Sequence, residues 1–215
     1  MTSSVLSVIA CVAVGYACGS LPWGLWLGKW FRGVDVRTLG SGNLGATNVF
    51  RSLGRGLGIA TLLLDMLKGG LAVWIVPALP IAEAFPGGAT ACSLVVGLAA
   101  IAGHVWTFLA GFKGGKGVAT TIGVLFAVAP QAFLAFVVVF VATVALTRFI
   151  SLGSVLGAVA FALVLGFQTA DGFRRLPFFF GVVAAALVIW RHRENLARIR
   201  AGTERRFSWH SEERA

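Results

Sequence analysis

Long apolar runs are the feature that most restricts this sequence. Seven are present, at residues 4–27, 57–79, 89–109, 118–129, 131–147, 152–169 and 176–190. An α-helix needs about 20 apolar residues to cross the hydrocarbon core of a bilayer. Of the 215 residues, 58% are hydrophobic and 12% are charged, which is more apolar surface than a soluble fold of this size can bury. The sequence therefore predicts an all-α integral membrane protein with about seven transmembrane helices, built as a single polytopic domain over residues 1–215.

The fourth run is the shortest, and only Pro130 separates it from the fifth. A run of about twelve residues is shorter than a usual membrane span. Two interpretations therefore stay open for it. It either crosses the bilayer or forms a re-entrant piece, which would leave six or five true crossings.

The positive charges predict the orientation of the helices. Of the 18 Lys and Arg residues, fifteen fall on one side of the seven-span arrangement and only Arg174 and Arg175 fall on the other. Because cytoplasmic loops are rich in Lys and Arg, we expect the N-terminus outside and the C-terminus in the cytoplasm, with a basic tail over about 191–215. The formal net charge of +10 thus lies in short loops and this tail. That placement suits anionic lipid headgroups of the bilayer and argues against a nucleic-acid partner.

Two features inside the apolar runs concern contacts between helices. Gly15 and Gly19 in the first run are spaced by four, which predicts a close approach of another helix. Asp65 and Lys68 lie one helical turn apart in the second run, so they share a face, where an ion pair lowers the cost of burial. Two roles stay open for this pair, a structural lock between helices and a supporting role at a functional site.

Polar residues are unusually dense in the first long loop, at residues 39–51. Hydrogen-bond donors stand there among three glycines. The donors are Ser41, Asn43, Thr47, Asn48 and Arg51, and the glycines are Gly40, Gly42 and Gly45. A flexible connector is one interpretation, but a loop of this length between membrane helices is more often functional. We therefore count these residues as candidates for binding an anion.

A second cluster, at residues 103–121, combines two lysines with a run of glycines. Lys113 and Lys116 flank Gly114 and Gly115, directly before the fourth apolar run. The spacing does not fit a Walker P-loop. It does suit a different phosphate site, in which the lysines and the glycine N–H groups bind an anion at the start of a helix. The alternative is that the lysines only enforce membrane topology. His104 is close enough in sequence to support this loop, either as a ligand or as a structural residue.

Two smaller polar clusters are predicted on the same side of the membrane. Ser151 and Ser154 open the sixth run, where hydroxyls are also ordinary helix caps. His192 and Asn195 follow the last run and are three residues apart, so they would share one helix face at the membrane surface. The alternative for that segment is a basic amphipathic tail that rests on anionic lipid.

These four clusters together predict a site for phosphate or a phosphorylated substrate on the inner face. The inner loops offer no acidic pair that could hold metal ions, so we expect neither a metal nor another cofactor. The sequence also lacks an aspartate five residues after any histidine. This excludes the acyltransferases that depend on a His-x4-Asp dyad and use CoA or carrier-protein donors.

The clusters also resemble a known family. Their segments are similar, in order and over nearly the whole chain, to the motifs of the bacterial acyl-phosphate:glycerol-3-phosphate acyltransferases, the PlsY family. The matching segments read GSGNLGATNVFR, DMLKG, GHVWTFLAGFKGGKGVAT, SLGS and RHRENLARIRAGTERRF. Two positions depart from the pattern, because Leu44 and Thr107 stand where the family has proline. Both changes affect loop stiffness more than charge.

The resemblance implies an enzyme of the bacterial inner membrane whose active site faces the cytoplasm. It would transfer a fatty acyl group from acyl phosphate to the 1-hydroxyl of sn-glycerol 3-phosphate, without a protein partner. It also implies roles for residues of all four clusters. Ser41, Asn43, Arg51, the two lysines and Ser151 would form two phosphate pockets, and His192 and Asn195 would orient the glycerol hydroxyl. It leaves open whether His192 is a general base or a positioning residue.

Two other classes of function compete with this interpretation. A membrane transporter of small organic phosphate anions would also need buried positive charge and interrupted helices. Against it, the sequence shows no inverted repeat, and the clusters fall on one face and not at the bilayer midplane. A structural membrane subunit would not need so many glycines and phosphate-binding side chains.

Overall fold

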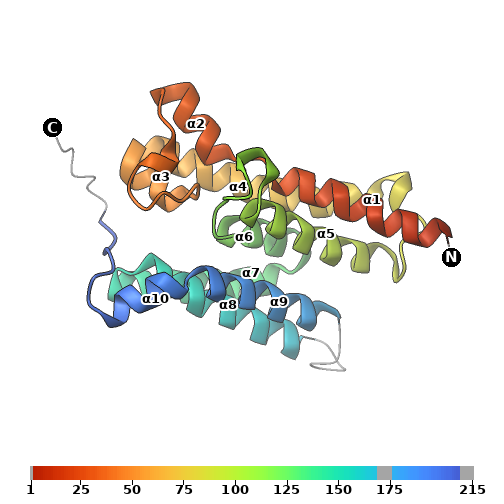
Figure 1. The fold of residues 1–215 in the computed structure, drawn as a ribbon. Coiled ribbons are helices and arrows are strands. Elements are labelled where there is room, and N and C mark those ends of the chain that lie inside the picture. The colour runs from red at the N-terminus through yellow and green to blue at the C-terminus, as the bar shows by residue number, and fades with distance from the viewer. Residues whose placement is uncertain (1, 169–175, 209–215) are drawn as a thin grey trace. The chain divides into compact units, whose positions relative to one another are not determined.

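The computed structural model describes residues 2–168 and 176–208, and every regular element in these ranges is a helix (Figure 1). The described chain therefore confirms the predicted all-α class. The elements are α1 (Thr2–Gly19), α2 (Trp23–Arg32), η1 (Val36–Thr38), α3 (Ala46–Leu53), α4 (Arg55–Ile75), η2 (Val76–Ala78), η3 (Pro80–Ala82), α5 (Gly88–Val105), η4 (Phe108–Ala110), α6 (Val118–Val128), α7 (Pro130–Thr147), α8 (Ile150–Phe167), α9 (Leu176–Arg191) and α10 (Arg193–Arg200). They form two compact units, Met1–Val128 and Ala129–Ala215, which are described separately below.

Within residues 2–168 and 176–208, five helical segments are long and apolar enough to cross a membrane. They are Ser3–Arg32, Arg55–Ala78, Gly88–Ala110, Pro130–Thr147 and Ile150–Phe167. A sixth is obtained if α9 and α10, which meet at a bend of 53°, are taken as one broken span. Helix α6 is apolar but shorter than these spans, as the sequence indicated for the fourth run. The predicted outer residues Arg174 and Arg175 lie outside the described residues.

The first apolar run was predicted as one helix, but it forms two. Helix α1 ends at Gly19 and α2 begins at Trp23, with Leu21 and Pro22 in the break between them. A proline has no N–H to continue the helical ladder, and it disfavours helical backbone in the residue before it. The hydrophobicity of the run is continuous, so only this proline signals the interruption.

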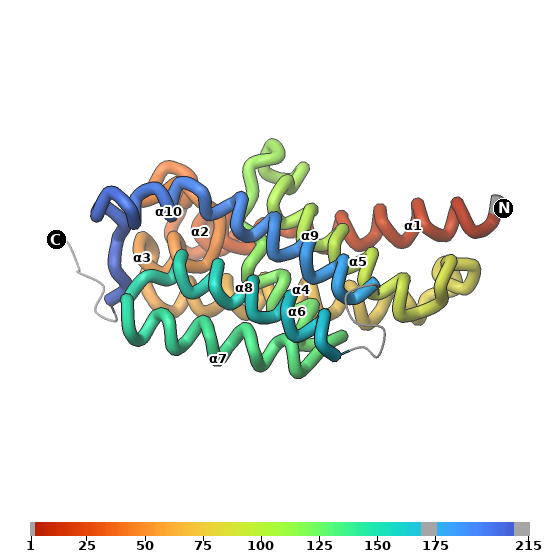
Figure 2. The backbone as a smooth tube through the Cα atoms, turned by 90° about the horizontal axis from the view of Figure 1, so that it is seen from below, coloured from red at the N-terminus to blue at the C-terminus, as the bar shows by residue number. Residues whose placement is uncertain are grey.

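Unit 1 is built from three main helix contacts. Helix α1 packs on α5, α4 packs on α6, and the short α3 packs on α4. The first of these contacts is visible in both views of the backbone (Figures 1 and 2). A Cβ placed on Gly19 would lie 2.0 Å from the carbonyl oxygen of Ala100, and one on Gly15 would lie 2.9 Å from that of Val96. The predicted close approach at the spaced glycines is thereby confirmed.

The first long loop is an ordered part of unit 1. It contains the 3₁₀ turn η1 and the helix α3, and α2 extends into it as far as Arg32. Its apolar residues form a small core of their own. The members of this core are Leu25, Val36, Leu44, Val49, Leu53 and Ala110. The alternative of a flexible connector does not describe this segment.

Unit 2 consists of α7, α8, α9 and α10. Helix α8 lies between α7 and α9 and contacts both, and α10 contacts α8 and α9 (Figure 2). Gly157 allows α7 and α8 to approach closely, because a Cβ there would lie 2.8 Å from the Phe136 ring. The junction between α7 and α8 turns through Arg148, which has a left-handed φ of 63°.

Replacing Gly19 with alanine tests the contact between α1 and α5. The added methyl meets backbone atoms of Ala100, which cannot move aside as a side chain could. We expect Gly19→Ala to cost about 1–3 kcal/mol, measured as a lower unfolding midpoint of the purified protein in detergent. Gly56→Ala is the matched control, because a Cβ there has no atom within 4 Å. An equal midpoint for both variants would contradict the close contact.

Candidate functional site

Asn48 organises the first polar loop of unit 1. Its side-chain oxygen accepts a hydrogen bond from the Ser41 N–H at 2.9 Å, and its amide nitrogen donates to the carbonyl oxygens of Val36, Leu39 and Asn43 at 2.9–3.2 Å. The residue is buried, so these bonds satisfy a polar group that would otherwise be costly. Asn48 was predicted to bind phosphate. The structure instead gives it the task of holding the loop in shape.

The other predicted residues of this loop are more accessible. The Asn43 side chain accepts a hydrogen bond from the Gly45 N–H at 2.8 Å, which forms a turn directly before α3. Ser41 is exposed, Thr47 is half-buried, and Arg51 is half-buried in the last turn of α3. The loop thus presents a hydroxyl and a guanidinium on a rigid support.

An ion pair connects this loop to the next one along the chain. Arg37 binds both carboxylate oxygens of Asp35, with a shortest distance of 2.6 Å, and also donates to the carbonyl oxygen of Ala110 at 3.4 Å. The hydrogen bonds from Arg37 lower the pKa of Asp35 to about 2. Asp35, in the loop between α2 and η1, is thus engaged by this arginine.

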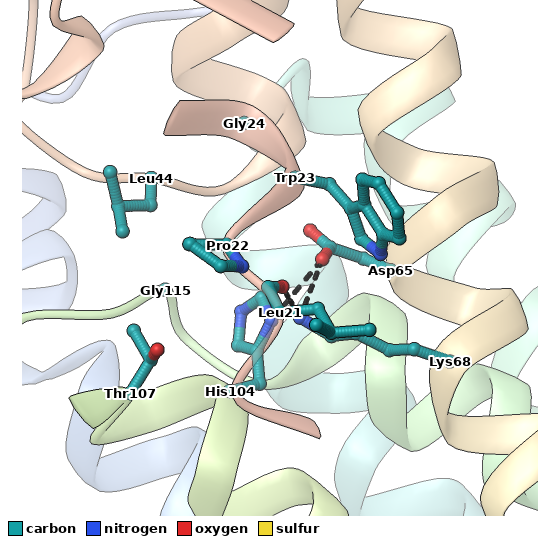
Figure 3. Close-up of a pocket in the computed structure, with 10 residues that line it drawn as sticks. All are labelled: Leu21, Pro22, Trp23, Gly24, Leu44, Asp65, Lys68, His104, Thr107 and Gly115. Carbon is teal, nitrogen blue, oxygen red and sulfur yellow. Dashed lines mark hydrogen bonds and ion pairs between the residues drawn. The ribbon is translucent and has the colours of Figure 1, made fainter. Parts of the chain in front are cut away.

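A buried charged cluster lies beneath these loops in unit 1 (Figure 3). The Lys68 ammonium is 2.8 Å from a carboxylate oxygen of Asp65 and donates to the Leu21 carbonyl oxygen at 2.7 Å. His104 Nδ1 lies 3.5 Å from the same carboxylate oxygen. Asp65, Lys68 and His104 are all at least 95% buried. The predicted ion pair is therefore present, and it also reaches the helix break and the histidine.

A small pocket opens beside this cluster (Figure 3). Its lining residues come from the helix break and the start of α2, from the two polar loops, from α4 and from the end of α5. They are Leu21, Pro22, Trp23, Gly24, Leu44, Asp65, Lys68, His104, Thr107 and Gly115. The Trp23 indole N–H is buried in this region without a hydrogen-bond partner. The pocket is thus lined by the charged side chains of Asp65 and Lys68 and by apolar side chains of the loops.

Both departures from the resembled motif line this pocket. Leu44 is buried in the loop core, and its carbonyl oxygen would lie 2.0 Å from a Cβ on Gly24. The buried Thr107 hydroxyl donates a hydrogen bond to the carbonyl oxygen of Ser20. It therefore ties the second loop to the break between α1 and α2. A hydrogen bond stands where the family pattern has a rigid proline ring.

The glycines of the second cluster have a different role from the one predicted. The Gly114 N–H donates to the Val105 carbonyl oxygen and the Gly115 N–H to that of His104, both at 3.1 Å. The two N–H groups are therefore used by the backbone, and the expectation that they face an anion is not met. A Cβ on Gly115 would lie 2.0 Å from His104 Nε2. The glycines let the loop pack directly on the histidine.

The two lysines of this loop differ in their exposure. Lys113 is exposed and Lys116 is half-buried, just before α6 begins at Val118. Their spacing and the packing of Gly115 on His104 give unit 1 a fixed basic loop above a buried charged cluster. Such a loop can attract and hold an anionic group.

In unit 2, three side chains converge on a carboxylate that the sequence reading missed. Glu204 accepts hydrogen bonds from the Ser151 hydroxyl at 2.9 Å, the Asn195 amide at 2.6 Å and the Arg198 guanidinium at 2.8 Å. Burial alone would raise the pKa of Glu204, but these three bonds outweigh it and hold the pKa below its usual range. The sequence signal that could have indicated a role for Glu204 is its position as an acidic residue inside a strongly basic tail.

His192 occupies the bend between α9 and α10. It is buried, and its Nδ1 lies 2.8 Å from the carbonyl oxygen of Val188. A carbonyl oxygen only accepts, so Nδ1 carries the proton and Nε2 holds the lone pair of the neutral ring. This tautomer can take up a proton at Nε2, as a general base must.

The Ser154 hydroxyl makes a local hydrogen bond within its own helix. Its hydroxyl donates to the Ile150 carbonyl oxygen at 2.9 Å, within α8. This is the usual way for a serine to satisfy its proton inside a helix. Neither serine caps the helix, because the cap position is Phe149 and makes no side-chain bond. Among the described residues, no group of three His, Cys, Asp or Glu side chains is arranged to hold a metal ion.

Comparison with known proteins shows one consistent match. The sequence model of the family described as "Glycerol-3-phosphate acyltransferase" matches residues 9–202. A protein of that name from Geobacter sulfurreducens is 47% identical over 204 residues, covering 94% of this chain and 98% of its own. One from Myxococcus xanthus is 46% identical over 200 residues, covering 92% of this chain and 98% of its own.

Two solved structures resemble the fold. Both are crystal structures of PlsY (YgiH), an integral membrane glycerol 3-phosphate acyltransferase. The glycerol 3-phosphate form has a TM-score of 0.81 at 38% identity, and the lysophosphatidic acid form has a TM-score of 0.79 at 37% identity. Each match covers 94% of this chain and 96% of the other.

Substitutions of Asp65 and Lys68 test whether the buried cluster is held by paired charge. Lys68→Met leaves the Asp65 carboxylate and the Leu21 carbonyl without their cation, which should cost about 3–5 kcal/mol. The double variant Asp65→Asn, Lys68→Met removes both charges and should lose clearly less. Unfolding midpoints in detergent provide the measurement, with the exposed Lys29→Met as control. A single variant no less stable than the double would contradict the pairing.

Proposed function

Because this chain belongs to the glycerol-3-phosphate acyltransferase family, we propose that it transfers a fatty acyl group from acyl phosphate to the 1-hydroxyl of sn-glycerol 3-phosphate. The products are lysophosphatidic acid and inorganic phosphate, and the reaction begins phospholipid synthesis. It is an integral membrane acyltransferase, as the curated relatives and solved structures indicate. The observation that carries the proposed reaction is the likeness to PlsY in both its glycerol 3-phosphate and lysophosphatidic acid forms.

The chemistry of an acyl phosphate suits the residues present. It is a mixed anhydride with a good leaving group, so the protein needs no nucleophile of its own. The enzyme has to hold two anions close together and orient one hydroxyl toward the acyl carbon. Basic and hydroxyl side chains are the groups that such a task requires.

We assign the phosphate contacts mainly to cationic side chains. Arg51 stands on α3, and Lys113 and Lys116 flank glycines that are packed against His104. Guanidinium and ammonium groups bind phosphate more strongly than neutral donors do. The exposed Ser41 hydroxyl adds a donor on the Asn48-braced loop. Asn43, Gly45 and Thr47 support this loop.

His192 is proposed as the group that receives the hydroxyl proton, and Asn195 as the residue that positions the hydroxyl. The bond from His192 Nδ1 to Val188 fixes the tautomer with a lone pair on Nε2. The Asn195 amide is oriented by its bond to Glu204. The two residues lie three apart, at the start of α10. A phosphate group of a substrate is the alternative proton acceptor.

The remaining parts of the proposal concern the setting of the reaction. The chain acts as a single polytopic acyltransferase domain over residues 1–215. Its N-terminus is outside, its basic tail is cytoplasmic, and its site faces the cytoplasm from the bacterial inner membrane. The distribution of Lys and Arg supports this orientation. No metal, other cofactor or protein partner takes part.

Two alanine substitutions test whether residues from both units are required. Arg51→Ala should remove a phosphate ligand and His192→Ala the proton acceptor, and each should lower acyl transfer by at least about a hundredfold. Arg55→Ala and Arg193→Ala are matched controls at exposed neighbouring positions. Turnover by purified enzyme is measured as phosphate release. Near-normal turnover in either variant would remove that residue from the site.

The donor specificity is tested directly with the purified protein. We expect acyl phosphate and glycerol 3-phosphate to give free phosphate and a lysolipid in equal amounts, unchanged by EDTA. Acyl-CoA should not replace acyl phosphate, because the mixed anhydride supplies both the activation and the anionic group that the basic residues bind. A higher rate with acyl-CoA would refute the proposed donor.

A further inference from the structure

Helices α1 and α5 run in the same direction and touch along a row of small residues. Gly15 of α1 faces Val96 of α5, and Gly19, one turn later, faces Ala100. Because both positions advance by four residues, the two helices are parallel (Figure 2). A Cβ on either glycine would meet a carbonyl oxygen of α5. The two backbones are therefore in direct contact along this row.

The same register, continued one turn toward the helix starts, pairs two cysteines. Cys11 stands four residues before Gly15, and Cys92 stands four residues before Val96. Both are free thiols without exposed surface, and a side-chain hydrogen bond joins them. A disulfide needs Cα atoms about 4.4–6.8 Å apart and side chains that point toward each other. Facing positions one turn away from a backbone contact fit both conditions.

A neighbouring turn holds this end of α1 in place. The Cys11 sulfur lies 3.9 Å from the carbonyl oxygen of Ile81 in η3, and the Ser7 hydroxyl donates to the same oxygen at 2.5 Å. A carbonyl oxygen only accepts, so the proton of the Cys11 thiol points toward Ile81. The Cys11 sulfur thus presents its lone pairs to Cys92.

The pair lies at an accessible edge of unit 1. Next to Cys11 on α1, Ile9 is 60% exposed and Val12 is 37% exposed, so a small apolar molecule can approach this helix from the bilayer. Cys92 lies in the second turn of α5, which starts at Gly88. In the proposed orientation this end of α5 faces the outside of the cell, where disulfides persist.

We propose that Cys11 and Cys92 are a redox-active pair that closes to a disulfide between α1 and α5, with a small apolar disulfide as the oxidant. The Cys11 sulfur attacks the oxidant, which forms a mixed disulfide and releases one thiol. The Cys92 sulfur then attacks the Cys11 sulfur and releases the second thiol. The two cysteines are oxidised, the reagent is reduced, and the two cysteine protons pass to the released thiols. This inference is independent of acyl transfer and rests on the proposed function only for the direction in which this helix end faces.

The test counts the pyridinethiol groups that stay on the full-length protein after treatment with dithiodipyridine. The protein is purified with a reductant, freed of it, treated in detergent and measured by intact mass and by non-reducing peptide mapping. A lone cysteine keeps one group, whereas a closed pair keeps none and loses two hydrogens. The chain has three cysteines, so we expect a single group, on Cys18, and a linked peptide that contains Cys11 and Cys92. Three retained groups, an unreacted pair or a link between two copies of the chain would each overturn the proposal.

Two alanine variants are the matched controls. Cys92→Ala leaves Cys11 without its partner, so this variant should keep two groups. Cys18 cannot replace Cys92, because it lies two turns along α1 from Cys11, about 10 Å away. Cys18→Ala should keep no group and still form the linked peptide. A bond between Cys11 and Cys18 in Cys92→Ala would contradict the assigned register. If Cys92→Ala does not fold, the linked peptide of the parent protein decides.

The closed pair should also stabilise the protein. The bond encloses a loop of about 80 residues, which contains α2, α3 and α4, and it restricts the unfolded chain over this length. We expect the unfolding midpoint of the oxidised parent to rise by roughly 5–15 °C and to return when a dithiol reductant opens the bond. Treated Cys92→Ala should show no such rise. An unchanged or lower midpoint in the oxidised parent would show that the bond distorts the contact between α1 and α5, and would overturn the facing geometry.

Discussion

Where a helix is interrupted, a backbone carbonyl oxygen loses its hydrogen bond within the helix. If that oxygen is buried in a membrane protein, another group must donate a hydrogen bond to it. In unit 1 this carbonyl belongs to Leu21, and the donor is Lys68. The lysine then requires a counter-charge, which Asp65 supplies, and the same carboxylate lies beside His104. Because Gly115 packs on His104, the basic loop is positioned by this chain of contacts. The interruption between α1 and α2 is therefore connected, through these contacts, to the loop that contains Gly115.

Unit 2 contains the opposite case, a buried negative charge that is surrounded by hydrogen-bond donors. A buried carboxylate needs donors, and Glu204 obtains them from Ser151, Asn195 and Arg198. In both units a charge sits in a buried environment and orders the neutral polar groups around it. Removing either buried charge would therefore change the arrangement of the neutral polar groups around it.

The sequence predicted the helical class and the positions of most apolar helices, because the thickness of a bilayer sets the length of the apolar run that a spanning helix needs. It failed at the first run, where hydrophobicity is continuous and only Pro22 marks the break. The predicted site residues stay a prediction, but the structure shows structural contacts for some of them that the sequence did not indicate. Asn48 and the N–H groups of Gly114 and Gly115 bind other parts of the protein. Glu204 was missed because composition alone cannot show that a tail folds back on a helix start.

The position of Glu204 in the chain also bears on biosynthesis. It follows α9 and α10, so the ribosome adds it after every described membrane helix has been made. A nascent chain that ends before Glu204 can insert its helices, but Ser151 and Asn195 then lack the partner that orients them. The contacts of these two residues with the tail are thus formed late in synthesis. Partly made chains would therefore lack the hydrogen bonds that join α8 and α10 to the tail.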